Sequence, residues 1–273
     1  MKNVLKILSV LTVLFISACS KDNIPDGQGA VNVRITDGPF PFEFVSEANV
    51  GLAKVELKNE AGEFVTVFEG SSKYNMVELT NGVSADVEKT NIPAGVYTES
   101  RITLNQASVL LSNGNSFNLS ADATAGSYTT PIEPAFTVEE GETSNVLFDL
   151  DLNSSFSFFG FGGLPFFDWI TSMSSISTCS FEPEFRVCDL DKTGSLSGVV
   201  TVNGTQSENV QLSIIVEGKQ ISTQSEANGS FAFIGVSPGV YTVSATNSNG
   251  DSAQVGNLTV TESNTTKCSV NIN

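Results

Sequence analysis

The sequence predicts an all-β protein made of two β-sandwich domains, and three observations carry this prediction. Apolar and polar residues alternate with a period of two in many short segments, as in strands that bury one face. Turn-forming Gly, Pro, Asn and Asp residues separate these segments at short intervals. No long segment has the 3.6-residue period of an amphipathic helix. The chain has 273 residues, which is enough for two sizeable cores.

Residues 1–18 have the pattern of a secretory signal. Lys2 and Lys6 make the first six residues basic. A short apolar segment follows, and Ile16-Ser17-Ala18-Cys19 comes after it. The apolar segment is too short to span a bilayer. The last four residues match the bacterial lipobox, in which the cysteine is lipidated and becomes the mature N-terminus. The sequence therefore predicts a lipoprotein signal peptide and lipidation of Cys19, with an ordinary cleaved signal as the alternative.

Residues 19–28 are polar and Gly-containing, so we expect a flexible tether between the lipid and the first domain. Acyl chains would hold the protein at the membrane without a spanning segment. Lys21-Asp22, just after the cysteine, resembles the surface-export signal of Bacteroidota-type lipoproteins. We therefore expect an outer-membrane lipoprotein exposed on the cell surface, with the periplasmic face as the alternative.

Residues 29–189 are predicted to form the first β-sandwich. Strand-like alternation or short apolar runs occur at Val31 to Ile35, Phe64 to Phe68, Tyr97 to Leu104 and Val146 to Leu152. Turn signals lie between them at residues 37–39, 59–62, 81–82, 93–95 and 113–114.

Residues 153–180 look like an enlarged loop of this domain. Seven of the chain's 24 aromatic residues (19 Phe, 4 Tyr, 1 Trp) fall in its positions 156–169, where Asp168 is the one charged residue. These rings could fill an inter-domain core or cap the sandwich. Alternatively they form an exposed platform for a sugar, a partner or the membrane, since monomers avoid large apolar patches that bind nothing. The candidate ligand-binding residues on the second interpretation are Phe159, Phe166, Phe167 and Trp169.

A domain boundary is predicted at residues 190–194, where the charge changes. Residues 28–189 hold 22 acidic and 7 basic residues, a net charge of −15, whereas residues 190–273 hold 6 and 3, a net charge of −3. A second series of strand patterns follows and predicts a small β-sandwich over residues 195–273. Its strands are expected at residues 195–202, 210–216, 230–233, 240–246, 253–260 and 265–272.

Composition excludes several functions. The chain has no histidine, which excludes Ser-His-Asp and Cys-His nucleophiles and histidine-ligated metal sites. Its net charge is −17, and removal of residues 1–18 with their two lysines makes it −19. Binding a nucleic acid needs clustered basic residues, so no nucleic-acid partner is expected.

Two acidic series match only part of a calcium-binding loop. Asp149-x-Asp151-x-Asn153 lacks both the turn glycine and the bidentate Glu. Asp189-x-Asp191-x-Thr193-Gly194 has the glycine but Val200 at the Glu position. We therefore interpret them as solvent-facing acids of a strand and a linker, and expect no metal and no cofactor. No residue is assigned a catalytic role, although the 30 acidic residues do not exclude a carboxylate pair for glycoside hydrolysis.

The remaining candidate sites are modifications. An exported protein permits disulfides, and Cys179 could bond Cys188 if the chain bends at Glu182-Pro183. Cys268 is expected to pack inward with its neighbours Val270 and Ile272. Asp251-Ser252-Ala253 resembles the O-glycosylation sequon of Bacteroidota-type exported proteins, which makes Ser252 a candidate, with an ordinary strand start as the alternative.

The two halves share a short pattern. Ile92-Pro93-Ala94-Gly95-Val96-Tyr97-Thr98 is similar to Val236-Ser237-Pro238-Gly239-Val240-Tyr241-Thr242, and both place a Pro-Gly turn before a strand that opens with Tyr. Two related sandwiches would explain this similarity, and so would convergent turn chemistry.

The C-terminal segment resembles the carboxypeptidase regulatory-like domain, a transthyretin-like sandwich with a carbohydrate-binding-like fold. The resemblance rests on residues 194–200, on Ala227-Asn228-Gly229-Ser230-Phe231-Ala232-Phe233 and on residues 235–243. The family's Asp-Gly-Pro insert after the first strand is shortened here to Asn203-Gly204-Thr205. The resemblance implies a topology and transfers no ligand.

The N-terminal segment is similar to a family of bacterial surface lipoproteins that is catalogued as a domain of unknown function. The similarity rests on residues 31–39, 92–102, 148–151 and 181–187, and it covers most of residues 28–189. It implies a location and a β-sandwich but no chemistry. The enlarged loop at 153–180 departs from the pattern.

These observations predict a non-enzymatic, lipid-anchored envelope protein that acts in binding or adhesion. Glycans are the first ligand class, and another envelope protein is the other candidate partner. The alternative is a structural or accessory subunit of a surface assembly, such as a fimbria-like or uptake complex. A metal-dependent hydrolase is the remote alternative.

Overall fold

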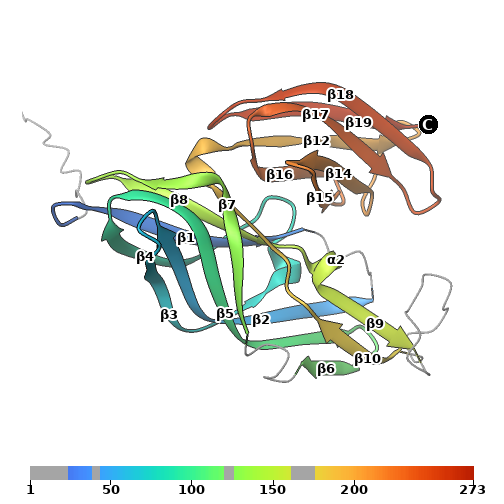
Figure 1. The fold of residues 1–273 in the computed structure, drawn as a ribbon. Coiled ribbons are helices and arrows are strands. Elements are labelled where there is room, and N and C mark those ends of the chain that lie inside the picture. Colours follow the sequence, from blue (N-terminus) through green and yellow to red (C-terminus); the bar gives the residue numbers. More distant parts are fainter. Residues whose placement is uncertain (1–23, 39–43, 120–125, 161–175) are drawn as a thin grey trace, which may run out of the picture.

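The computed structural model describes residues 24–38, 44–119, 126–160 and 176–273, and nearly all of its regular structure is β-strand (Figure 1). Two separate hydrophobic cores divide the chain. We call residues 28–189 the N-terminal unit and residues 194–272 the C-terminal unit. The predicted all-β class is confirmed. The described part of the chain contains no helix with the length and hydropathy of a bilayer span.

The N-terminal unit is built on one nine-stranded sheet. Its strand order is β3-β2-β5-β7-β11-β8-β1-β4, with β6 added to β5. These strands are β1 (Gln28–Asp37), β2 (Val45–Asn59), β3 (Phe64–Asn75), β4 (Ala85–Pro93), β5 (Gly95–Leu111), β6 (Ser116–Leu119), β7 (Ser127–Val138), β8 (Thr143–Leu150) and β11 (Phe185–Asp189). A separate hairpin, β9 (Phe156–Gly160) and β10 (Ile176–Phe181), lies beside it. The short helices are η1 (Met76–Glu78), α2 (Leu152–Ser155) and η3 (Leu190–Lys192).

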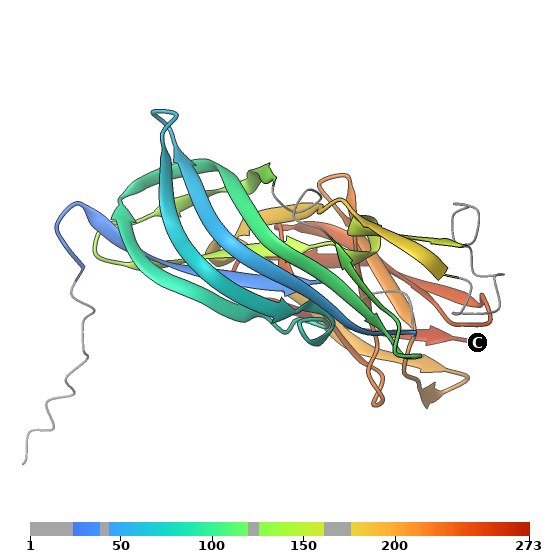
Figure 2. The ribbon, with the colours of Figure 1, turned by 90° about the horizontal axis from the view of Figure 1, so that it is seen from below.

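The nine-stranded sheet folds over on itself as a sandwich. Its two halves are joined by a single parallel pair, Val187 of β11 with Ile132 of β7. At the other side the end strands β3 and β4 lie against each other. The long strands β2 and β5 shift register at several points, which strengthens their twist and lets them wrap the core (Figure 2). Period-two patterning predicts the inner face of β1 correctly, because Val31, Val33 and Ile35 are all buried.

The C-terminal unit is a sandwich of two four-stranded sheets. One sheet has β12 (Gly194–Val202) paired with β13, β16 and β19, and the other has the order β15-β14-β17-β18. The remaining bounds are β13 (Thr205–Gln206), β14 (Gln211–Val216), β15 (Lys219–Gln224), β16 (Ser230–Val236), β17 (Gly239–Thr246), β18 (Ser252–Val260) and β19 (Thr265–Ile272). The core between the sheets contains Leu196, Val200, Phe231 and Phe233.

The repeated pattern, in which proline and glycine precede Val-Tyr, makes the same local contact in both units. The Tyr97 hydroxyl donates to the carbonyl of Pro93 at 2.8 Å, and the Tyr241 hydroxyl donates to the carbonyl of Ser237 at 2.6 Å. Each bond spans four residues and closes the corner through which one strand leads into the next, as in the tyrosine corners of β-sandwiches. Burial raises the pKa of both phenols. Similar turn chemistry is therefore present twice, whatever its origin.

The structure corrects the prediction of an enlarged loop at residues 153–180. Residues 152–160 form α2 and β9, and residues 176–181 form β10. The predicted strand at residues 146–152 also ends earlier, at Leu150, because Asp151 caps α2 by accepting the Ser154 N–H at 3.1 Å. Phe156 and Phe158 are buried in the N-terminal core, as the core-filling interpretation requires.

The predicted disulfide is absent, because Cys179 and Cys188 are both free. The chain does bend at residues 182–184, but the two cysteines on either side of the bend lie in different pairs of strands. Cys179 in β10 pairs with Phe158, whereas Cys188 in β11 pairs with Leu147 of β8. Burial raises the pKa of Cys179 to about 12 and that of Cys188 to about 11, so both are unreactive thiols. Cys268 packs against the C-terminal core.

We expect Tyr97→Phe to destabilise the protein by about 1 kcal/mol, because it removes the donor to the Pro93 carbonyl while keeping the ring. Urea unfolding measures the change. Tyr241→Phe is the companion variant for the second corner, with a loss of similar size expected. A Tyr97→Phe midpoint equal to that of the parent protein, with an unchanged m-value, would show that the corner contributes nothing to stability.

Candidate binding cleft between the two units

The two units are joined by a short linker, and acidic residues at the start of this linker accept several hydrogen bonds. Asp189 is buried, and its carboxylate accepts the N–H groups of Thr137 at 3.2 Å and Asp191 at 3.0 Å. Asp191 accepts the backbone and side-chain N–H groups of Asn145 at 2.7 and 2.9 Å. Ser263 of the C-terminal unit donates to the Asp191 and Thr193 carbonyls. The interpretation of Asp189 as a solvent-facing linker acid is therefore wrong, because its oxygens hold the start of the linker in place.

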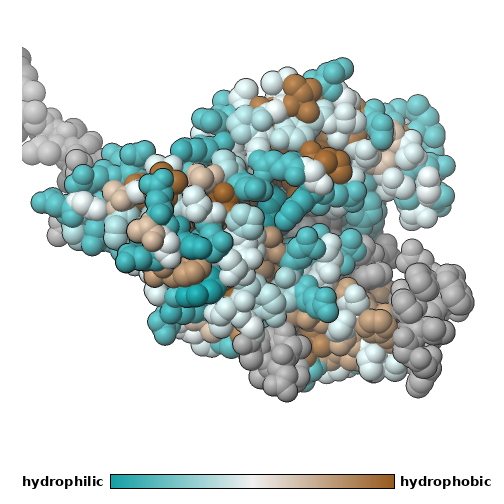
Figure 3. Space-filling view, in the orientation of Figure 1, coloured by the Kyte–Doolittle hydropathy of each residue, from teal (hydrophilic) through white to brown (hydrophobic). Residues whose placement is uncertain are grey.

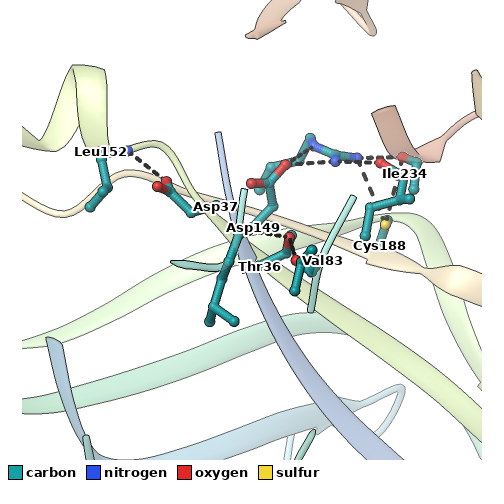
Figure 4. A network of polar contacts seen from close by, with 10 residues as sticks. Thr36, Asp37, Val83, Asp149, Leu152, Cys188 and Ile234 are labelled. Carbon is teal, nitrogen blue, oxygen red and sulfur yellow. Dashed lines mark hydrogen bonds and ion pairs between the residues drawn. The ribbon is translucent and has the colours of Figure 1, made fainter. Parts of the chain in front are cut away.

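Arg186 is the central contact between the units. Its guanidinium donates to Asp149 Oδ2 at 2.7 and 3.2 Å inside the N-terminal unit. The same group donates across the boundary to the carbonyls of Ile234, at 3.2 Å, and Gly235 (Figure 4). The side chains of Arg186 and Asp149 are only 13% and 15% exposed. The interpretation of Asp149 as a solvent-facing acid is therefore also wrong, because Asp149 is the partner of a mostly buried arginine.

Asn81 makes a second contact across the boundary. Its Oδ1 accepts the Ala232 N–H at 2.6 Å, and its Nδ2 donates to Glu226 at 2.8 Å. Asn81 and Gly82 both have positive φ, 57° and 80°, so the Asn-Gly turn aims this side chain at β16. Thr36 fixes the turn by donating to the Val83 carbonyl at 2.6 Å.

A cleft with a volume of about 250 Å³ opens beside these contacts. One wall comes from the ends of β1 and β8, from α2 and from β11, and the other comes from β15 and β16. Most of the lining side chains are polar or charged. Phe185 and Phe233, also at the cleft, are buried in the cores of the two units. The molecular face in Figure 3 is largely hydrophilic, with hydrophobic groups scattered over both units.

Asp37, at the end of β1, is the most perturbed acid of the cleft. It is 5% exposed, and its Oδ1 accepts the Leu152 N–H at 3.2 Å (Figure 4). Its Oδ2 is buried and has no hydrogen-bond partner in the described part of the chain. Burial, with the nearby charge of Asp149, raises the pKa of Asp37 well above its ordinary value. A buried carboxyl with an unsatisfied oxygen beside a cleft is typical of a functional site.

The aromatic residues proposed from sequence do not line this cleft where the structure describes them. Phe159 is half-buried in β9, while Phe166, Phe167 and Trp169 lie outside the described residues, as does Cys19. Ser252 is exposed at the start of β18, where a modification is sterically possible. Among the described residues, no group of three His, Cys, Asp or Glu side chains could hold a metal ion.

Sequence reasoning missed Asp37, Asn81 and Arg186 as site residues. Asp37 and Asn81 were visible only as turn residues. Arg186 lies in a strand-like segment, and a single basic residue among apolar residues gives no sequence signal of a site. The pairing of positions 37, 81, 149 and 186 depends on sheet order, which the local pattern does not contain.

Residues 28–160 match the model of a family described as Domain of unknown function (DUF4382). The predicted similarity of the N-terminal segment to a domain of unknown function is confirmed over these residues, whereas the resemblance of the C-terminal segment stays a prediction. No curated protein matches the chain.

Several solved structures align with the chain at low similarity. The Bacillus anthracis TIE protein matches with 13% identity and a TM-score of 0.24, and the alignment covers 90% of this chain and 51% of that one. BcpA, the major pilin subunit of Bacillus cereus, matches with 11% identity and a TM-score of 0.23 over 90% and 99% of the two chains. The shaft pilin SpaA of Lactobacillus rhamnosus GG matches with 9% identity and a TM-score of 0.26 over 90% and 98%. At these TM-scores the alignments support no argument about function.

Arg186→Met is expected to destabilise the protein by about 3 kcal/mol, because it leaves Asp149 mostly buried without its partner. Urea unfolding measures the loss. Arg34→Met is the matched control, since Arg34 pairs with an Asp86 side chain that is 67% exposed, and its cost should stay below about 1 kcal/mol. Equal losses in the two variants would contradict the central role of Arg186.

Asp37→Asn is expected to stabilise the protein at neutral pH, because it removes a carboxyl whose pKa is raised on folding. A raised folded pKa costs stability above the unfolded value of about 3.9, and the cost disappears below it. The advantage of the variant should therefore shrink as the pH falls from about 7 to about 4. Urea unfolding at both pH values measures it. An Asp37→Asn protein that is less stable than the parent at both pH values would contradict this account.

Proposed function

We propose that the protein is a non-enzymatic, lipid-anchored cell-envelope protein that binds a carbohydrate at the cell surface. The observation that carries the binding role is the cleft between the units, because its lining combines carboxylates, amides and hydroxyls. A concave site lined by several polar groups suits a small polar ligand. The anchor at Cys19 and the outer-membrane location belong to this proposal and are supported by the lipobox pattern.

The position of the cleft suits display away from a membrane. β1 begins at Gln28, directly after the proposed tether, and ends at Asp37 in the cleft wall. At about 3.3 Å per residue, this strand separates the anchored end from the cleft by about 30 Å. In Figures 1 and 2 the C-terminus lies at the end of the molecule opposite the start of β1. A ligand held outside the cell would thus meet the cleft before it met the lipid.

One observation favours hydrolysis as a second candidate function. A carboxyl with a raised pKa near a second acidic residue is the arrangement of a general acid with its partner. Asp149 is engaged by Arg186, however, and Asp37 Oδ2 is buried, so neither group is presented as a free reactant. Binding is therefore the function that we propose first.

Soluble residues 20–273 are expected to bind specific members of a glycan array. Gln220 is an exposed residue of the cleft wall, and Gln220→Ala should weaken this binding roughly fivefold through the loss of a neutral hydrogen bond. Trp169→Ala tests the aromatic segment as the site instead, and Lys267→Ala, exposed on β19, is the control. The amount bound at a series of protein concentrations gives the affinities.

Loss of binding in Trp169→Ala with retention in Gln220→Ala would place the site on the aromatic segment. New reducing ends on bound glycans would establish the hydrolase. Absence of binding to every glycan would make carbohydrate recognition wrong, and cross-linking on intact cells would then test the alternative of a subunit in a surface assembly.

A further inference from the structure

The edge strand β15 turns backbone donors and acceptors toward the cleft. A two-residue turn at 217–218, in which both residues have positive φ, joins it to β14. In such a hairpin, pairs that exchange backbone hydrogen bonds alternate with pairs that do not. Because Lys219 closes the turn opposite Val216 in a hydrogen-bonded pair, Gln220 and Ser222 fall in the pairs without these bonds. Their N–H and C=O groups therefore point away from β14.

This edge is left open where the neighbouring edge is covered. Gln220 lines the cleft, and β15 pairs only with β14 in the described structure. On β16, by contrast, Arg186 and Asn81 cover the edge with side-chain hydrogen bonds. No described residue accepts the backbone N–H of Gln220 in a comparable way. An open edge of this kind can bind a partner that supplies both donors and acceptors.

Gly38 limits the length of such a partner. A methyl group added at Gly38 would lie 3.4 Å from the Ser222 carbonyl oxygen, so the backbone at Gly38 passes beside the middle of β15. A peptide strand paired along the whole edge would lie about 4.8 Å from β15, where Gly38 already is. The volume of the cleft, about 250 Å³, is likewise small for a binding site. A partner is therefore short, and it binds beside Gln220, two residues nearer the turn.

The opposite wall offers acceptors and disfavours an acidic ligand. Asp151 and Glu184 line it with carboxylates, which accept hydrogen bonds from hydroxyl groups. Arg186 neutralises Asp149, so the charges that remain at the cleft surface are these two acids and Lys219. This excess of negative charge repels a ligand that carries an acidic group.

We propose that the cleft binds a single sugar unit without an acidic group, held by the exposed backbone of Gln220. This inference rests on the proposed carbohydrate-binding function and specifies the size and charge of its ligand. A hydroxyl group both donates and accepts, so neighbouring hydroxyls of one sugar match the C=O and N–H of Gln220. A further hydroxyl would donate to the carboxylates of the opposite wall. Because one unit fits, the ligand is the end of a glycan chain and not its interior.

Amide chemical shifts of isotope-labelled residues 20–273 test the place and the charge class together. The probes are glucose, galactose and mannose, each beside its own uronate. We expect at least one hexose to shift the Gln220 amide resonance, and its uronate to bind at least about threefold more weakly, as for a surface charge interaction. A uronate that binds as tightly as its hexose would overturn the charge class. Hexose binding that leaves the Gln220 amide unmoved would overturn the site.

Two substitutions at Gln220 separate its backbone from its side chain. Gln220→Pro deletes the N–H, and proline is tolerated on an edge strand where the N–H faces outward. Gln220→Ala keeps the N–H. We expect the proline variant to bind the hexose at least about fivefold more weakly than the alanine variant, as for the loss of one hydrogen bond. Equal affinities of the two variants would overturn the role of the backbone.

Gln254→Pro is the matched control, on the other edge strand of the same sheet, β18. The Asn247 N–H donates to the Asp251 carbonyl at 3.0 Å, so the pair of Ser244 with Gln254 is one without backbone hydrogen bonds. The Gln254 N–H therefore also points outward, and its loss should leave hexose binding unchanged. Urea unfolding checks that each proline variant is folded. If Gln220→Pro does not fold, the amide shift in the parent protein decides the assignment.

The two proposals fail in different ways. Glycans retained on the array should carry the preferred hexose at a chain end. Retention of chains that hold it only in the interior, or retention of glycans without binding of any hexose, would overturn the single-unit inference and leave carbohydrate binding intact. Absence of binding to every hexose and every glycan would overturn both.

Discussion

The contact on which this architecture depends is the polar cover that the N-terminal unit places over the open edge of β16. This strand pairs only with β12 in the described structure, so the backbone groups on its other side need partners from elsewhere. Arg186 donates to two of its carbonyls, and Asn81 accepts one of its N–H groups. The units are therefore joined by hydrogen bonds of the kind that join strands, with side chains in the place of a neighbouring strand. An edge left open would be a template for pairing with other chains.

The same cover creates the cleft. Asp149 holds the Arg186 guanidinium at the end of β8, from where it reaches β16, and Asp37 lies at the end of the neighbouring strand β1. Arg186 satisfies Asp149, whereas Asp37 accepts the N–H of Leu152. The surplus negative charge lies where the two units diverge. The site is thus a by-product of how the edge is covered, and its cost is the desolvation of Asp37.

The sequence predicts much of this fold and little of this site. Alternating patterns identify β1, β5, β8 and most strands of the C-terminal unit, because each buries one face on a single core. β15 escapes prediction because its sequence, Lys219 to Gln224, has one apolar residue, and its pairing rather than its pattern defines it. Asp149 was noticed for the wrong reason, as half of a calcium motif. Its true partner, Arg186, is fixed by the pairing of β8 with β11, which no local pattern encodes.

The cover over β16 also determines what the cleft can do. Because the walls come from different units, motion between the units would change the distance between the acids on β1 and β8 and the polar edge of β15. Arg186 and Asn81 oppose that motion with hydrogen bonds to β16, and the carboxylates of Asp189 and Asp191 hold the linker against the N-terminal unit. A preorganised cleft loses less conformational freedom on binding, so more of its interaction energy appears as affinity. The buried, unpaired oxygen of Asp37 fits the same logic, because a rigid frame can hold an unfavourable group in place.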